Sequence, residues 1–332
     1  QTDRYTVLLD KGDSRDLKAP EIETTTRKLL AYFKTGVALP NSMFWVNLRP
    51  DSDANIIDPY LERTDIGKVF LAADVQLKKD LARFTSPDTR EGREYWNKLY
   101  ARAAELFGPQ ENVTIPTVSR PWIVPGEIIL KQTPQGVYVH KAVMRVCLEQ
   151  DWINAQTATN SIPEQAVPVS ADARFRTINA YSAQLLRALV IPRLTREVNS
   201  SKRYSELRQV FYSLVLAQWY KAGRSDAGAD IESGLSIDSK DLTGLTSQQS
   251  WSKQDYYRDY RRSFQDGEYN KQEQVRTQGG IAIRRYFSGG IASAIDPSSI
   301  TVMQQRGTGD GFQVTPDTVG VEVSPQGMLV QM

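Results

Sequence analysis

Histidine and cysteine are almost absent from this sequence of 332 residues, which has one of each, His140 and Cys147. A lone cysteine cannot form a disulfide within the chain, so cysteine usage indicates no redox compartment. A Ser–His–Asp triad would need His140, whose neighbours "VYVHKAV" alternate as in a strand. A zinc site would need carboxylates or a second chain to complete its ligands. The composition therefore argues against most histidine- and cysteine-based chemistry.

Excess charge and long apolar runs are also missing. Lysine and arginine number 41 against 39 aspartates and glutamates, and a net charge of +2 gives no electrostatic reason to expect nucleic acid as a partner. The longest apolar runs, such as "LVLA" at 214–217, are much shorter than the roughly 18 residues that a membrane span needs. We therefore predict no nucleic-acid partner and no membrane span.

The patterns that are present predict an α+β fold. The predicted class is a small mixed or antiparallel sheet with flanking helices, then a mainly helical lobe and a short β-rich C-terminal tail. The three parts are an α+β domain over 1–153, a helical lobe over 172–269 and a Gly-rich β tail over 270–332. The polar, proline-bearing segment 154–171 separates the first two parts.

Periodicity and capping residues predict the individual elements. Thr64 and Ser86 are predicted N-caps, and Gly36 and Gly108 are predicted to end helices. Pro192 is predicted to kink or break its helix, because it lacks a backbone donor. The predicted elements are strands over 4–12 and 43–50, a hairpin over 127–147, and helices over 19–36, 65–84, 87–107, 171–199, 204–221 and 253–266.

The stretch "SWSKQDYYRDYRRSFQDGEY" at 250–269 raises a choice between stacking of bases and burial of a helix face. On a helix, Tyr256, Tyr260 and Phe264 recur every four residues and share one face. Its basic residues are interleaved with aspartates, whereas nucleic-acid surfaces carry excess positive charge beside exposed aromatic rings. We therefore predict a packing helix whose end is set by Gly267.

The best metal candidate is "DSDANIIDPYLE" at 51–62. Asp51, Asp53, Asn55 and Glu62 occupy positions 1, 3, 5 and 12 of a calcium loop. Ile56 stands where such a loop requires glycine, and a strand precedes the segment in place of a helix. These departures favour an ordinary turn, so we expect no cofactor here other than a calcium ion bound weakly.

Two further motifs have some features of a phosphate-binding loop and of a glycosidase active site. "RGTGDGF" at 306–312 has glycines but lacks the Lys-Ser/Thr and the helix of a phosphate cradle, so a hairpin turn is favoured. Glu149 and Asp151 in "EQDW" form the carboxylate pair that a glycosidase could use as acid and base. With 39 acidic residues in the chain, such a pair also arises by chance.

Several strings resemble an uncharacterised family of often long bacterial proteins from uncultivated lineages. They are "FWVNLRPDSDANIIDP", "DIGKVFLAADVQLKKDLARFTSP", "REYWNKLYARAAELFG", "RPWIVPGEIIL", "LRQVFYSLVLAQWYK" and "RRYFSGGI", and they span roughly residues 40–290. The resemblance implies a bacterial origin and export. It assigns no activity, cofactor or catalytic residue.

Two functional hypotheses follow. The first is a non-catalytic structural or interaction protein, extracytoplasmic or at the cell surface, whose partners are copies of itself or other surface proteins. Its short tail strands within 296–332 cannot stand alone, so they are predicted to join a sheet of the same molecule or of a neighbour. The alternative is a carboxylate-dependent hydrolase that acts on a polysaccharide.

Overall fold

The computed structural model describes residues 5–10, 19–41, 44–48, 56–108, 111–133, 136–155, 172–225, 253–268, 270–274, 280–293, 295, 299–304, 318–324 and 327–331. Its helices are α1 (Ala19–Ala38), α2 (Asp65–Thr85), α3 (Arg93–Phe107), α4 (Glu149–Ala155), α5 (Ala173–Leu185), the π-helical turn η1 (Leu186–Val190), α6 (Ile191–Ser200), the 3-10 turn η2 (Lys202–Tyr204), α7 (Ser205–Ser225) and α9 (Lys253–Gln265). Its strands are β1 (Tyr5–Asp10), β2 (Trp45–Val46), β3 (Thr114–Ser119), β4 (Pro121–Thr133), β5 (Gly136–Leu148), β6 (Asn270–Gln274), β7 (Ala282–Phe287), β8 (Gly290–Ala292), β9 (Ile300–Gln304), β10 (Thr318–Ser324) and β11 (Gly327–Gln331). The predicted α+β class is confirmed.

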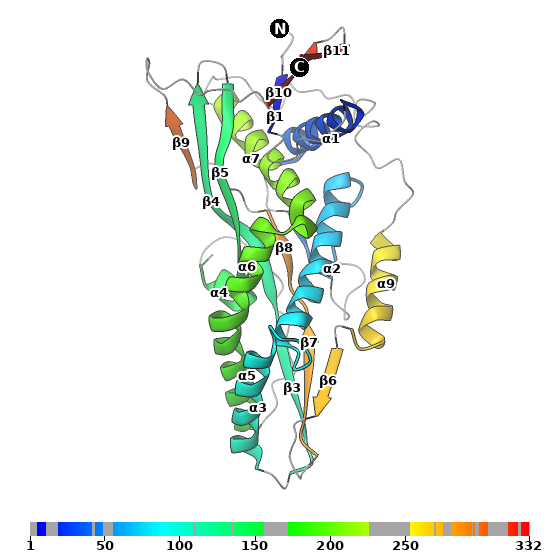
Figure 1. The fold of residues 1–332 in the computed structure, drawn as a ribbon, viewed down its shortest axis with the longest axis vertical. Helices are drawn as coiled ribbons and strands as arrows, with labels where there is room; N and C mark the ends of the chain where they lie inside the picture. The colour runs from blue at the N-terminus through cyan, green and yellow to red at the C-terminus, as the bar shows by residue number, and fades with distance from the viewer. Residues whose placement is uncertain are drawn as a thin grey trace.

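The described strands form three sheets (Figure 1). The largest has the order β2-β8-β4-β5, and β9 joins it by pairing in parallel with the second half of β4. The long antiparallel hairpin β4–β5 confirms the predicted hairpin and extends it to Pro121 and Leu148. A second sheet has the order β3-β7-β6, and a third has the order β1-β10-β11, near both chain ends in Figure 1.

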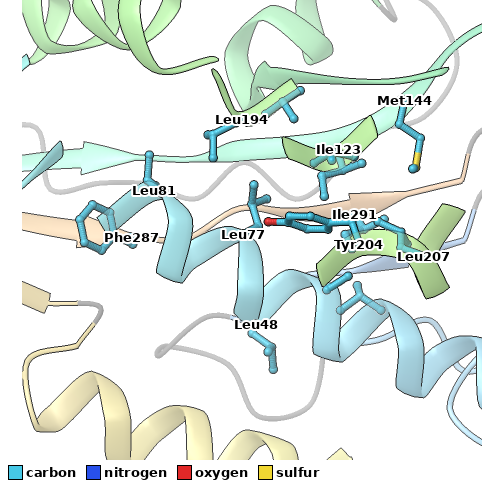
Figure 2. Close-up of a cluster of buried hydrophobic side chains, with 14 of the residues drawn as sticks. Leu48, Leu77, Leu81, Ile123, Met144, Leu194, Tyr204, Leu207, Phe287 and Ile291 are labelled. Atoms are coloured by element: carbon cyan, nitrogen blue, oxygen red, sulfur yellow. The ribbon is translucent and has the colours of Figure 1, made fainter. Parts of the chain in front are cut away.

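Helices cover one side of the hairpin sheet and build the main core (Figure 2). α6 and α7 pack on β5, while α2 packs on β2, β7 and β8. Leu77 of α2, Tyr204 of η2 and Ile291 of β8 are all buried in this cluster. The opposite face of β4 carries a smaller cluster in which the rings of Trp122 and Trp152 lie 5.1 Å apart.

The main core draws on all three predicted parts of the chain. Ile123, Tyr204 and Ile291 come from the first, second and third parts respectively, and all belong to one cluster. In the third part, β7 lies between β3 and β6, and β8 lies between β2 and β4. The division into three domains stays a prediction, but β7 and β8 of the third part are interior strands of two sheets.

Helix ends follow the predicted capping chemistry at Thr64 but not at Gly36. The Thr64 Oγ1 accepts a hydrogen bond from Gly67 N at 3.1 Å and begins α2 as predicted. The prediction that Gly36 ends its helix is wrong, because α1 continues to Ala38. A Cβ atom at Gly36 would lie 2.9 Å from the Cβ of Ala217. Gly36 therefore allows α1 to pack closely on α7.

The prediction that Ser86 caps a helix is also wrong, since α3 begins at Arg93. The side chain of Thr89 donates to the Ser86 carbonyl at 3.1 Å and accepts from Gly92 N at 3.1 Å. A Cβ at Gly92 would lie 2.3 Å from the Ser86 carbonyl oxygen. These contacts fold residues 86–92 into a compact turn, which competes with the helix that Ser86 and Pro87 favour locally.

Pro192 does not break the long helix of the second part. The π-helical turn η1 precedes α6. Pro192 lies in the first turn of α6, where a missing backbone donor is tolerated. α5, η1 and α6 therefore follow one another directly from Ala173 to Ser200.

The helices predicted over 204–221 and 253–266 are both present, as α7 and α9. In α7, Phe211, Leu214 and Val215 are buried, whereas Trp219 is only partly buried. In α9, Tyr260 is buried and Phe264 packs partly buried, its ring 6.4 Å from that of Tyr286. The side chain of Tyr256 lies outside the described residues.

The end of α9 also matches its prediction. Gly267 has a φ of 85°, and its backbone N donates to the Phe264 carbonyl at 3.2 Å. A left-handed residue at this position favours glycine, as the sequence pattern indicated.

Candidate interaction site at a sheet edge

The predicted calcium ligands do not come together in the described structure. Asp51, Asp53 and Asn55 lie outside the described residues, and Glu62 is half-buried in the turn before α2. Within the described part of the chain, no group of three or more His, Cys, Asp or Glu side chains is placed to hold a metal ion. The ordinary turn predicted at 51–62, with calcium bound weakly at most, therefore stays a prediction.

Glu149 and Asp151, the predicted acid–base pair, are engaged by separate partners. The Glu149 carboxylate accepts from Trp122 Nε1 at 2.9 Å and from Arg120 Nη1 at 3.1 Å. Asp151 accepts from two nitrogens of Arg187 at 2.8 and 2.9 Å. Two residues apart on α4, the carboxylates do not face each other. They anchor α4 to β4 and η1, and this geometry gives the hydrolase alternative no support.

His140 and Cys147 both lie on β5, in settings that suit no reactive role. His140 is exposed on the strand predicted for it. Cys147 is partly buried, and burial raises the pKa of its thiol to about 11. Because the thiolate is the nucleophilic form, this cysteine is inert near neutral pH.

The sequence did not reveal a fully buried ion pair between Asp74 and Lys78 of α2, whose side chains are both 0% exposed. Lys78 Nζ donates to Asp74 Oδ1 at 2.5 Å and to the Gly289 carbonyl at 3.2 Å. The other Asp74 oxygen accepts from Leu48 N at 2.9 Å. Burial raises the pKa of Asp74 and lowers the pKa of Lys78. Solvent does not reach either group, so the pair joins α2 to β2 and β8 and offers no surface to a substrate.

The motif "RRYFSGGI" supplies the backbone around this pair. Gly289 has a φ of 109°, and a Cβ there would lie 2.0 Å from the Pro121 carbonyl oxygen. Only glycine allows this approach, which sets the carbonyl that Lys78 contacts.

Arg285 is a second buried charge, at the junction of α2, α3 and the β3-β7-β6 sheet. It donates to the Thr85 carbonyl and forms an ion pair with Glu273. Its guanidinium carbon lies 5.4 Å from the ring centre of Trp96. Burial lowers the pKa of Arg285, which remains a structural cation.

Side chains of the long helix cover two edges of the sheets. Asn199 of α6 accepts from Met144 N at 3.0 Å and donates to the Met144 carbonyl at 2.6 Å, which caps the edge of β5. Thr195 accepts from Val146 N at 3.2 Å on the same edge. Asn179 of α5 likewise accepts from Val118 N and donates to the Pro116 carbonyl on β3. Backbone groups on these edges are therefore unavailable to another chain.

We predict that Asn199→Ala lowers the free energy of unfolding by about 1–3 kcal/mol, because a partly buried backbone pair loses both partners. Urea denaturation followed by circular dichroism measures the change. Ser200→Ala is the matched control, since the exposed Ser200 hydroxyl bonds only to Arg196 of its own helix, and it should change stability by less than about 0.5 kcal/mol. Equal stabilities of the two variants would show that the cap contributes nothing.

β9 is an edge of a different kind (Figure 1). Among the described strands it pairs with β4 alone, and its sequence "ITVMQ" carries no charge. Val302 is 37% exposed and Met303 is 47% exposed. By contrast, the edge strand β6 reads "NKQEQ" and is polar throughout. Charged or covered edges resist pairing with other chains, and β9 shows neither protection among the described residues. The edge strand β11, "GMLVQ", is also uncharged.

The molecule is an α+β protein with buried structural ion pairs and, in the part of the chain that the structure describes, an apolar strand edge at β9. None of its described helices is both long and apolar enough to cross a membrane. Compared with models of known families, with curated proteins and with solved structures, the chain matches none.

Proposed function

We propose that this is a non-catalytic structural or interaction protein that associates with copies of itself through the free edge of β9. The observation that carries the proposal is the contrast between this edge and the edges of β3 and β5. Those edges are capped by Asn179, Thr195 and Asn199. On β9, by contrast, the side chains of Val302 and Met303 are exposed on opposite faces of the strand, and no described side chain caps its outer edge.

The chemistry of β9 suits a second copy of the same chain. A two-fold interface brings identical residues opposite or near one another, so like charges on the strand would repel. The five residues of β9 carry none. Antiparallel pairing of two β9 strands would join the two hairpin sheets into one continuous sheet by main-chain hydrogen bonds.

The expected strength of the association follows from the surface area that two paired β9 strands would bury. A strand of five residues buries less surface than a stable dimer needs, which is at least about 1,000 Å². We therefore expect a dissociation constant on the order of 10–100 µM. A weak edge contact of this kind suits a protein that is crowded with copies of itself on a surface. Bacterial origin and an extracytoplasmic or cell-surface location belong to the same proposal and rest on the family resemblance.

The test is sedimentation velocity across a concentration series from a few micromolar to several hundred micromolar. The unaltered chain should shift towards a dimer, and Val302→Lys with Met303→Lys should remain monomeric, because charge blocks edge pairing. The matched control is Tyr60→Lys with Ile153→Lys, which replaces the other two exposed large apolar side chains of the described residues, 60% and 37% exposed.

The control pair should dimerise as the unaltered chain does. An unaltered chain that stays monomeric throughout the series contradicts the proposal. So does equal dimerisation of the two double variants.

A further inference from the structure

A shallow hollow of about 420 Å³ lies where the turn after α2 meets α6. Four arginines line it: Arg83 from α2, Arg90 from the turn, and Arg193 and Arg196 from α6. Two carboxylates, Glu91 and Glu197, also reach it. The site is separate from the β9 edge and does not depend on the function proposed for that edge.

Two of the arginines are fixed by the fold. Arg83 Nη2 lies 3.5 Å from Glu197 Oε1, and its guanidinium carbon is 4.5 Å from the ring centre of Phe84. Arg193 donates to the Glu91 carbonyl at 2.5 Å, and its other terminal nitrogen lies 3.9 Å from Glu94. These contacts hold the two guanidinium groups at the wall of the hollow.

The other two arginines are uncommitted. Arg90 and Arg196 are exposed, and in the described part of the chain the guanidinium group of neither residue makes a hydrogen bond or an ion pair. Other arginines at the surface of the molecule do pair with carboxylates, as Arg187 does with Asp151 and Arg174 does with Asp172. Two unpaired guanidinium groups in one hollow therefore leave a local excess of positive charge.

Glu197 does little to cancel that excess, because another arginine engages it. Arg203, which is not among the lining residues, donates to Glu197 Oε2 at 2.7 Å and also lies 3.0 Å from the buried Asp80. Burial alone would raise the pKa of Glu197, but the Arg203 hydrogen bond and the nearby positive charges lower it, so this carboxylate stays ionised and paired. Glu91 is then the lining carboxylate left to oppose the arginines.

We propose that the hollow binds a phosphate or sulfate group, with Arg90 and Arg196 as the two free ligands. A guanidinium group presents parallel N–H donors whose spacing matches two oxygens of a tetrahedral oxyanion. A doubly charged anion matches two free cations, whereas a single carboxylate leaves one unpaired. The hollow falls in the size range of small-ligand sites, so the group is either a free ion or the substituent of a larger molecule, for which a sulfated saccharide serves as the probe.

The first experiment measures binding of inorganic phosphate and inorganic sulfate to the full chain by calorimetry, at constant ionic strength set with sodium chloride. Arg90→Gln with Arg196→Gln should weaken binding at least about tenfold. Arg261→Gln with Arg262→Gln is the control, since it removes the same charge from two exposed arginines on α9. This control should bind as the unaltered chain does.

A second arm distinguishes the two sources of the group. Dextran sulfate is compared with dextran and with free sulfate at equal sulfate concentration. Tighter binding of dextran sulfate, lost in the Arg90/Arg196 variant, identifies a site for a sulfated or phosphorylated saccharide, and equal binding identifies a site for the free ion. Absence of phosphate and sulfate binding overturns the proposal, as does an equal loss in both arginine double variants.

Discussion

Lys78→Met is expected to lower the free energy of unfolding by about 3–5 kcal/mol, because it leaves the carboxylate of Asp74 buried without its cationic partner. Both side chains are wholly inaccessible, and Lys78 also donates to the Gly289 carbonyl. Lys79→Met is the control, since the Lys79 side chain is 51% exposed and its ion pair with Glu268 is long, at 3.8 Å. The control should change stability by less than about 0.5 kcal/mol. Urea unfolding followed by circular dichroism measures both variants.

The loss in Lys78→Met should depend on pH in a defined direction. Burial already raises the pKa of Asp74, and removal of Lys78 takes away the charge that opposes this rise. The folded variant then binds a proton at Asp74 more tightly than the unfolded chain does. The contribution of Asp74 to stability should therefore be greatest below its unfolded pKa, about 3.9, and fall as pH rises towards the raised folded pKa. A deficit relative to the unaltered chain that shrinks on raising the pH would contradict this assignment.

Arg285→Met is the second change expected to have a large effect, again about 3–5 kcal/mol. It leaves Glu273 without its cation and the Thr85 carbonyl without its donor, in the interior between α2, α3 and β7. Arg284→Met serves as the comparison, because Arg284 is the neighbouring residue on the opposite face of β7 and donates at 2.8 Å to Asn270. That variant should lose about 1 kcal/mol.

Thermal and urea unfolding of the two β7 variants decide between these outcomes. A similar loss for both would show that burial of Arg285 is not the source of its effect. Glu273→Gln adds a further check, because it keeps an acceptor beside Arg285 while removing its charge, and its loss should be smaller than that of Arg285→Met.

Local patterns in the sequence predicted the elements whose signals are themselves local. The four-residue spacing of Tyr260 and Phe264 marked a packing face, and the glycine at 267 marked the end of α9. Thr64 marked the start of α2 by its side-chain hydrogen bond. The predictions at Gly36 and Ser86 were wrong because neither residue type has a single use. Gly36 allows close helix packing and Ser86 lies in a compact turn, and the local sequence does not distinguish these uses from helix ends and caps.

Pairing between distant segments was harder to predict from the sequence. The tail strand 300–304 was predicted to join a sheet, and it does so by pairing with β4 of the same molecule. The interior positions of β7 and β8 were not predicted, because Gly-rich alternating runs carry no signal for the partner strand. The ion pair of Asp74 and Lys78 was missed since charges within a helix suggest a solvated face. Their four-residue spacing among Phe70, Leu77 and Leu81 was the available signal.

The candidate site was predictable only in part. Unpaired tail strands suggested association through a sheet, but the choice of edge depends on which edges Asn179, Thr195 and Asn199 cover. Those caps join residues more than 45 positions apart, so no local pattern in the sequence predicts them. The arginine hollow depends in the same way on how α6 meets the turn after α2.

Amide hydrogen exchange of the β9 segment, residues 299–304, at low and at high protein concentration tests self-association through this edge most directly. Dilute and concentrated samples of the unaltered chain are compared under identical conditions. Protection in 299–304 should rise with concentration as outward-facing amides of β9 pair with a second copy, while protection at the capped edge of β5 stays constant. Association accompanied by unchanged exchange in 299–304, or new protection confined to another surface, would contradict the account.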